Sequence, residues 1–486
     1  MYDTTAIRTV GSALQAAAPD STVALPGTAQ YDESIRRWAP NAEKRSAVIL
    51  RAISGADVST GVLFAQAMGL EVAVVGGGHG TNGAAATPGL LIDLRALNKI
   101  TVDVEHKTIT AGGGCRWEDI DLALAPHGLV TVGGRVGDTG IGGLTLGGGV
   151  GWLSGKYGLV VDNLLRAQMV LADERIVTAS ATENPDLFWA VRGAGQCFGV
   201  AIELTYRAHN QADPIWPGQL VTTLDTLPAV VDFANRFPAI NRVTNAASLN
   251  VTIAGPPVNS LVTTLLYPGQ RVEAEAFFAP LLALDHVHNT TAERPYTEAN
   301  TIITPRVPWD IRRQNVGIAF PVPLRVGLLE SLINSLVELR GQVSADAPPG
   351  MVILEMTEKG TMGGIPTSAM AFAGRQLHNV CMVVAQWRVA EHDLVARQWL
   401  SKAAATLDHE LEAMKDKHDG SIDLNAVRVY SNYDSLLMPE EEVFGTNLPR
   451  LTMLKEKYDP KDVFCTSYAL LRRRSIGGTT VDSIGS

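Results

Sequence analysis

The sequence predicts an α+β protein of at least two domains, and three observations support this class. The chain has 486 residues, which is more than one hydrophobic core usually holds. Residues 1–208 alternate short buried strands, helices and glycine clusters, whereas residues 209–425 mix strand and amphipathic-helix patterns with few glycine clusters. Two prolines and several polar residues in 209–218 are typical of a boundary between domains.

The first part begins with a strand–helix–strand pattern. Residues 46–50 are an apolar run, and Ser54 is placed to cap a helix that ends near Gly69. A buried strand at 71–75 then runs directly into a glycine cluster. The remaining elements that we expect in this part are strands at 90–94 and 107–111, a helix at 116–126 and a hairpin over 167–179 that turns at Asp173-Glu174.

The second part carries longer patterns. We expect strands at 248–253, 351–356 and 380–387 and amphipathic helices at 325–340 and 391–414. Three residues on these strands, Glu355, Gln386 and Trp387, are able to face a ligand, but a structural or solvent-facing role fits each of them equally well. From about residue 428 the chain returns to short, aromatic and polar segments.

Charge and cysteine content exclude several classes of function. The formal net charge is −10 and no basic run occurs, which argues against a nucleic-acid partner. The four cysteines, Cys115, Cys197, Cys381 and Cys465, are widely spaced and form no zinc-type pairs, so no metal site is predicted. The first residues lack a signal-peptide pattern and no apolar run is long enough to cross a bilayer, so we expect a cytoplasmic protein with no membrane partner. The oligomeric state is not predicted.

Two glycine-rich segments point to a phosphate-containing ligand. Gly78 to Gly83 fits G-x-G-x-x-G after a strand, but a proline, a glycine and another strand follow instead of a helix, which argues against a Rossmann site. Successive glycines let backbone N–H groups approach an anion closely. A second such segment at 140–152 makes a long dinucleotide a better match than a single phosphate. The alternatives are that both segments are structural turns and that His79 is a hydrogen-bonded loop histidine.

Several motifs resemble, in family order, the FAD-linked oxidases of the vanillyl-alcohol-oxidase and p-cresol-methylhydroxylase (PCMH) family, in the berberine-bridge-enzyme branch. The resemblance covers most of residues 30–208 and 425–470, whereas the middle of the chain is only loosely similar. The motifs are VVGGGHGTNG before LLIDL, GDTGIGGLTLGGGVGWLSGKYGLVVDNLL at 137–165, ENPDLFWAVRGAGQCFGV at 183–200, VYSNYD at 429–434 and LKEKYDPKDVF at 454–464.

This resemblance implies a two-domain, PCMH-type FAD-binding fold with a central substrate domain. The domains would be 1–208 (FAD-binding, N-terminal part), 209–425 (substrate-binding) and 426–486 (return to the FAD-binding domain and tail). His79 falls on the position that is bonded covalently to the flavin, and Tyr430 and Asn432 match a Tyr-x-Asn motif that faces flavin and substrate. The other residues that would line the cofactor are Gly76, Gly77, Gly78, Gly80, Asn82, Gly140, Gly142, Gly143 and Val200.

The departures from the family pattern concern the flavin and the substrate. Many relatives attach FAD a second time through a cysteine, and this chain has Val136 there, so we expect a single attachment through His79. Val75 replaces a basic residue that often precedes the glycine loop, and Cys197 replaces an asparagine. Ser467, Tyr468 and Ala469 replace the usual polar residues after Phe464, so the substrate contacts are not predicted.

The function that follows is FAD-dependent oxidation of a small organic substrate, in specialised metabolism. A hydride would leave a C–H next to oxygen or nitrogen, and O₂ would reoxidise the flavin to give H₂O₂. Tyr430 is the candidate base and Asn432 would orient it or the substrate, although a packed aromatic with a satisfied hydroxyl is the alternative for Tyr430. The alternative functions are oxidative or redox-neutral cyclisation, electron transfer to another acceptor, and non-catalytic flavin or ligand binding.

Overall fold

A four-stranded sheet lies at the N-terminal end of the chain. The computed structural model describes residues 4–211, 214–241, 247–303, 308–357, 360–375, 379–415 and 429–471. The strand order in this sheet is β1-β2-β4-β3, and β4 is parallel to both β2 and β3. The strands and the adjoining helices are α1 (Thr4–Ala17), β1 (Thr22–Ala24), α2 (Ala29–Ile35), β2 (Val48–Arg51), α3 (Gly55–Met68), β3 (Val72–Val75) and β4 (Leu90–Asp93).

Helix α3 connects β2 to β3 and confirms the prediction made around Ser54. The Ser54 hydroxyl oxygen accepts a hydrogen bond from the backbone N–H of Asp57 at 3.2 Å, which caps the first turn. The helix ends at Gly69, whose φ of 63° is a left-handed conformation that glycine adopts without a steric penalty. No helix occurs in residues 76–89, all of which the structure describes, so the absence of a Rossmann unit is confirmed.

An antiparallel five-stranded sheet follows, with strand order β5-β6-β10-β8-β9. Its β8–β9 pair is the hairpin predicted over 167–179. Helices α4, α5 and α8 pack with it into a core that contains Trp117, Trp152, Phe198 and Tyr206. The elements are β5 (Ile100–Asp103), β6 (Thr108–Gly112), α4 (Trp117–Leu124), β7 (Leu129–Val130), α5 (Ile141–Leu146), α6 (Ser154–Tyr157), α7 (Val160–Asn163), β8 (Leu164–Val170), β9 (Ile176–Ser180), α8 (Pro185–Ala194), β10 (Val200–Arg207) and β11 (His209–Asn210).

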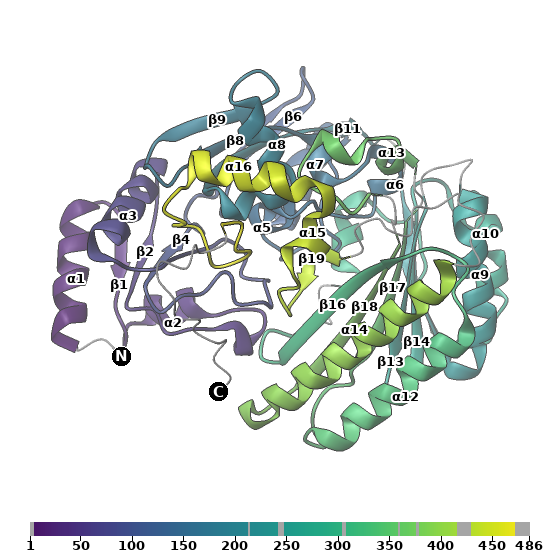
Figure 1. The fold of residues 1–486 in the computed structure, drawn as a ribbon. Coiled ribbons are helices and arrows are strands. Elements are labelled where there is room, and N and C mark those ends of the chain that lie inside the picture. The colour runs from purple at the N-terminus through teal and green to yellow at the C-terminus, as the bar shows by residue number, and fades with distance from the viewer. Residues whose placement is uncertain are drawn as a thin grey trace.

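The second part is built on an eight-stranded sheet with strand order β15-β12-β14-β13-β17-β18-β16-β19. Helices α9, α12 and α14 cover one face of it, with α12 and α14 lying against each other (Figure 1). The elements are β12 (Trp216–Thr223), α9 (Leu227–Ile240), β13 (Ser248–Ala254), β14 (Ser260–Tyr267), α10 (Arg271–Phe277), α11 (Ala279–Leu282), β15 (His288–Asn289), β16 (Arg312–Phe320), α12 (Val326–Gln342), β17 (Met351–Thr357), α13 (Gly360–Gly363), β18 (Asn379–Trp387), α14 (Asp393–Lys415) and β19 (Val429–Asp434).

The two faces of this sheet differ in character. On β13, Leu249, Val251 and Ile253 belong to the core under the helices. Asn250 and Thr252 point the other way, because successive side chains of a strand lie on opposite faces, and they line a cavity. The helix-free face is therefore turned toward the first part of the chain.

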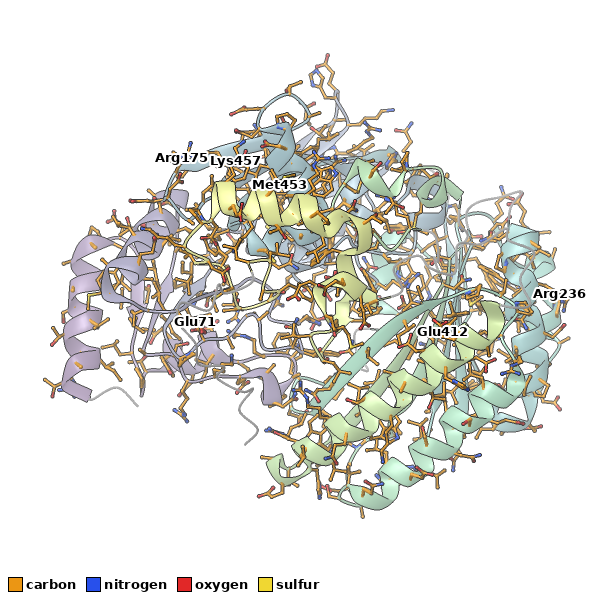
Figure 2. The ribbon with its side chains drawn as sticks, in the orientation of Figure 1. Glu71, Arg175, Arg236, Glu412, Met453 and Lys457 are labelled. Atoms are coloured by element: carbon orange, nitrogen blue, oxygen red, sulfur yellow. The ribbon has the colours of Figure 1, made fainter. Side chains whose placement is uncertain are left out.

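The C-terminal segment contacts both parts of the molecule. Strand β19 pairs with β16 at the edge of the large sheet. Helices α15 (Glu440–Phe444) and α16 (Leu448–Tyr458) then return to the core of the first part. On α16, Met453 is exposed, and Lys457 donates to Asp186 of α8 at 2.6 Å (Figure 2 labels both α16 residues). The short helix Tyr296–Thr301, from within the second part, also packs against α4.

None of the helices in the described part of the chain is long and apolar enough to cross a membrane.

Asp121 of α4 provides a test of the contact between α4 and the 296–301 helix. A side-chain oxygen of Asp121 accepts a hydrogen bond from the Asn300 amide at 2.5 Å, and burial raises the pKa of Asp121 to about 8. The unfolded chain loses this proton near pH 4, so the folded state binds the extra proton between about pH 4 and 8. We therefore expect the free energy of unfolding of the wild type, relative to Asp121→Asn, to fall by about 1.4 kcal/mol per pH unit across that window.

Urea unfolding at several pH values measures this difference, with the exposed Asp285→Asn variant as the control. A difference between wild type and Asp121→Asn that does not change from pH 5 to 8 would contradict the assignment.

Candidate functional site

A cavity of about 710 Å³ lies between the glycine-rich segments of the first part and the helix-free face of the eight-stranded sheet. Its volume is in the range of about 300–1,000 Å³ that is usual for ligand and cofactor sites. All of the residues that we expected at the cofactor or the substrate line this cavity. They are Gly76, Gly77, Gly78, His79, Gly80, Asn82, Gly140, Gly142, Gly143, Val200, Tyr430 and Asn432. Segments separated by as many as 350 residues thus form one site.

The two glycine-rich segments touch through their backbones at Gly77 and Gly140. A Cβ atom on Gly77 would lie 2.1 Å from the backbone nitrogen of Gly140, and one on Gly140 would lie 2.3 Å from that of Gly77. Real Cβ atoms do not approach other atoms so closely, so both positions need glycine for the segments to meet. Asn82 closes the first segment, because its side-chain oxygen accepts a hydrogen bond from the N–H of Ala84 at 3.0 Å.

The second glycine-rich segment contains a short helix, α5, that the glycine content concealed. Gly140 precedes α5, and Gly142 and Gly143 lie within it. A Cβ atom on Gly143 would meet no atom within 4 Å, and Gly143 is exposed at the cavity. The fold itself therefore has room for a side chain at Gly143, and a ligand lying against α5 is what would use that space.

His79 follows β3 and is held between two indole rings. It stacks on Trp38 with ring centroids 5.2 Å apart and meets Trp309 edge-on at 5.4 Å. Its Nε2 lies 3.1 Å from a carboxylate oxygen of Asp138, and its Nδ1 lies 3.5 Å from the hydroxyl of Thr139. The ring therefore has a fixed orientation at the cavity wall.

Asp138 is in turn held by Trp309, whose indole N–H donates to the second carboxylate oxygen at 2.8 Å. Burial alone would raise the pKa of Asp138, but the hydrogen bonds from His79 and Trp309 outweigh it, so this pKa lies below its ordinary value. Asp138 is thus a carboxylate at neutral pH, with one oxygen directed at the histidine.

Tyr430 and Asn432 on β19 hold the C-terminal end of α5 and the loop after it. The Tyr430 hydroxyl oxygen accepts from the backbone N–H of Val150 at 3.1 Å and from the Asn432 amide at 3.0 Å. The same amide donates to the carbonyl of Leu144 at 2.9 Å. Burial raises the pKa of Tyr430 to about 12, so the phenol keeps its proton at neutral pH. The anion that the predicted base role needs is therefore disfavoured.

A bulge in β19 brings Tyr433 to the same wall as Tyr430. Val316 of β16 pairs with Asp434 and Ile318 pairs with Val429, so five steps along β19 lie opposite two steps along β16. Gly317 of β16 lies opposite the bulge, where a Cβ atom would be 2.7 Å from the Cβ of Tyr433. The bulge thus needs a glycine on the neighbouring strand.

Glu355, Gln386 and Trp387, whose roles we could not assign from the sequence, lie on different faces of the sheet. Glu355 and Gln386 line the cavity. Trp387 lies in the core on the opposite face, and its indole N–H donates to Asp393 at 2.6 Å. Val136 lines the cavity, whereas no cysteine among the described residues does. The described residues also contain no cluster of side chains that would hold a metal ion.

Four further residues of the site were not predicted. Arg135 and Asp138 directly precede the second segment, where charged residues next to glycine are a usable signal. Arg135 lines the cavity, and Asp138 contacts His79. Tyr433 lies within the VYSNYD motif, but its direction depends on the bulge. No local sequence pattern indicates a role for Trp309, because it contacts a histidine that lies 230 residues away in the chain.

The residues at the cavity fit a flavin dinucleotide. The touching glycines and the open space beside Gly143 leave a smooth backbone wall against which a long, flat molecule can lie. At the same wall, the buried side-chain oxygen of Gln196 has no hydrogen-bond partner among the described residues, which suits contact with a polar ligand.

Comparisons with known proteins agree with this fit. Residues 46–180 match the family model of the FAD binding domain, and residues 429–469 match that of berberine and berberine-like proteins. The FAD-linked oxidoreductase pgmH of Aspergillus terreus is 32% identical over 455 residues, which cover 89% of each chain. (R)-6-hydroxynicotine oxidase of Paenarthrobacter nicotinovorans is 40% identical over 189 residues, which cover 39% of this chain and 41% of that protein.

A solved structure shows the same architecture. The crystal structure of 6-hydroxy-D-nicotine oxidase from Arthrobacter nicotinovorans superimposes with a TM-score of 0.77 at 25% identity, covering 93% of this chain and 98% of that one. The fold and the site thus define an FAD-dependent oxidoreductase with a PCMH-type FAD-binding domain. Within that class, the chain belongs to the FAD-linked oxidoreductases of the berberine-bridge-enzyme-like branch.

A pair of glycine variants separates folding from cofactor binding. Gly143→Ala should stabilise the flavin-free protein by about 0.5–1 kcal/mol, because alanine favours a helix more than glycine does. It should also lower the flavin content, because its methyl group enters the cavity. Gly77→Ala should destabilise the protein by about 1–3 kcal/mol through overlap with Gly140. Thermal unfolding and the flavin-to-protein absorbance ratio measure both effects; full flavin content in Gly143→Ala would place the cofactor elsewhere.

Proposed function

We propose that this enzyme is an oxidase that holds FAD through one covalent bond to His79 and oxidises a C–H next to oxygen or nitrogen in a small organic molecule. O₂ is the proposed electron acceptor and H₂O₂ the proposed second product. The observation that carries the proposal is the single cavity in which His79, both glycine-rich segments and the Tyr430–Asn432 pair meet. The names of the oxidases among the relatives agree with it.

The surroundings of His79 support covalent attachment through Nδ1. Asp138 faces Nε2 at 3.1 Å, which favours the tautomer that carries its proton on Nε2. Nδ1 then keeps its lone pair and is the nucleophilic nitrogen. Trp38 and Trp309 fix the ring plane, so the chain itself sets the position of Nδ1. Val136 and the absence of a cavity-lining cysteine among the described residues support a single bond.

Bound FAD supplies a two-electron acceptor for the substrate C–H bond. The chain's own residues position the reactants. Tyr430 and Asn432 fix the backbone at the end of α5. The phenol keeps its proton at neutral pH, so it is available to donate a hydrogen bond to the substrate rather than to act as a base. The sheet face on the other side of the cavity excludes water and carries the polar groups that contact the substrate.

Removing His79 or Asp138 tests the attachment. His79→Ala should bind FAD only non-covalently, so that denaturation releases all of it. Asp138→Ala should lower the covalent fraction at least about tenfold at a fixed time after flavin addition, because the Nε2–H loses its acceptor. In-gel flavin fluorescence and peptide mass spectrometry measure the fraction and its location, with the exposed Asp103→Asn variant as control. Covalently bound flavin in His79→Ala at the wild-type level, or a flavin adduct on another peptide, would contradict the proposal.

Tyr430→Phe tests the role of the phenol. Two N–H donors lose their acceptor, so we expect kcat to fall about tenfold or more. The pH profile of kcat/KM should keep the same shape between pH 6 and 10, because the wild-type phenol titrates near pH 12. Tyr31→Phe is the matched control, because its buried hydroxyl lies outside the cavity and donates to the carbonyl of Ser46. A basic limb that disappears in Tyr430→Phe would restore Tyr430 as the base.

The reaction type is tested on the purified enzyme with a substrate from a compound screen. One H₂O₂ per product in air, and no turnover under argon, is the expected result. Product formed without O₂ consumption would identify a redox-neutral cyclisation. A bound flavin that neither substrate nor dithionite reduces would identify a non-catalytic flavin-binding protein.

A further inference from the structure

Four polar side chains lie in one line across the face of the eight-stranded sheet that lines the cavity. Gln219 of β12 pairs with Thr264 of β14, Thr264 pairs with Asn250 of β13, and Asn250 pairs with Glu355 of β17. Directly paired residues share one face of a sheet, so their side chains are neighbours. All four side chains line the cavity, and each residue is at most 5% exposed. We call this line the polar row.

An ion pair ends the polar row at Glu355. One carboxylate oxygen lies 2.5 Å from Arg135, and the other accepts a hydrogen bond from Tyr433 at 3.1 Å. Arg135 also donates to Thr357 at 3.0 Å and lies over the ring of Trp152. Taking two charges out of water is costly, so a buried pair of this kind is weak evidence for stability. This pair lies at the cavity wall, where a ligand that reaches the end of the row meets it.

The rest of the polar row offers hydrogen-bond acceptors. The Asn250 side-chain oxygen is buried and has no donor among the described residues. The amide of Gln219 is directed along the row, because it donates to Thr264 at 3.1 Å. A ligand that covers Asn250 must therefore supply an O–H or N–H group to avoid leaving this buried acceptor unsatisfied. Glu355, the next residue of the row, is an anionic acceptor for the same group.

The neighbouring rows of the same face are mostly apolar. The row beside the polar row contains Val262, Ile353 and Met382 around Thr252. The next one carries Ala254, Met351 and Val384. This face therefore pairs one hydrogen-bonding edge with an apolar surface.

The charged side chains of Arg135, Glu355, Arg313 and Asp434 at the cavity wall already have ionic or hydrogen-bond partners. Arg135 and Glu355 neutralise each other. Arg313, at the far end, donates to the backbone carbonyls of Ile311 and Pro308. Asp434 accepts hydrogen bonds from the backbone N–H of Met438 and from Tyr468. A charged ligand would have to compete with these partners for any counter-charge.

We propose that the substrate is an uncharged, mainly apolar compound whose O–H or N–H group donates to Asn250 and Glu355. The apolar body lies over the Val262–Ile353–Met382 row. This inference deepens the proposed oxidase function and rests on the same cavity, but it concerns recognition and not the redox step.

Four bicyclic probes of matched shape test the substrate class by calorimetry on the purified protein. They are 2-naphthol (a neutral donor), 2-methoxynaphthalene (neutral, without a donor), 2-naphthoate (an anion) and N,N,N-trimethyl-2-naphthylammonium (a cation). The naphthol should bind about 10- to 100-fold more tightly than the methyl ether, as expected for a hydrogen bond to a charged or buried acceptor. Both ions should bind more weakly than the naphthol.

Variants link this preference to the polar row. Asn250→Ala should reduce the naphthol-to-ether affinity ratio about tenfold. Glu355→Gln keeps the shape but leaves Arg135 without its counter-charge, so naphthoate should gain about tenfold in affinity while naphthol loses. Thr263→Val, on the opposite face of β14, is the control that should leave the ratio unchanged. Circular dichroism and thermal unfolding establish that each variant is folded, and Arg135→Met/Glu355→Leu offers a charge-neutral replacement if Glu355→Gln does not fold.

The outcomes separate this inference from the proposed function. Equal affinities for naphthol and ether, tighter binding of either ion by the wild type, no binding of any probe, or a ratio that Asn250→Ala leaves intact would each overturn the inference. Flavin content and reduction are measured separately in the same preparation. A flavin-free protein that still showed the naphthol preference would keep the inference and remove the oxidase function.

Discussion

The contact between the backbones of Gly77 and Gly140 is the constraint on which the site depends. It joins the loop after β3 to the start of α5, and no side chain larger than hydrogen fits at either position. Through this contact, the loop that carries His79 lies beside the residues just before Gly140, which include Asp138. The glycines of the two segments therefore fix the distance between the segments as well as leaving a bare wall for the cofactor.

The eight-stranded sheet completes the cavity, and its side chains form hydrogen bonds with the same segments. Asn432 donates to Leu144, Ser431 donates to Gly147 at 3.0 Å, and the Ser248 hydroxyl donates to the carbonyl of Trp152 at 2.8 Å. Thr81, just beyond His79, donates to Asn315 of β16 at 2.8 Å. The contacts of Ser248 and Thr81 are buried, and those of Ser431 and Asn432 are partly buried. Losing either partner of such a bond is costly, so these bonds hold the two halves together. The cavity is thus a consequence of how the halves are joined.

Most of the local structure was predictable, because its causes lie within a few residues. The cap at Ser54, the end of α3 at Gly69 and the β8–β9 hairpin all follow from local sequence. The motif resemblance brought the glycine segments, His79 and the Tyr430–Asn432 pair into one expected site. The pattern of the sequence did not indicate α5, because glycine is a poor helix former. Nor did it indicate the Trp309–His79 contact, the bulge that turns Tyr433 inward or the Arg135–Glu355 pair, all of which depend on distant pairings.

Side chains along β13, β14, β17 and β18 alternate between the cavity and the core under the helices. Selection for substrate binding and selection for stable packing therefore act on different positions of the same strands. Residues 250, 252 and 254 meet the cavity, while 249, 251 and 253 meet the helices, and the other three strands follow the same rule. Substitutions at the cavity-facing positions leave the packing under α12 and α14 untouched. Such a sheet can diverge in substrate choice from one relative to the next while its core stays nearly constant. Libraries confined to alternate positions would therefore explore new substrates with little loss of folded protein.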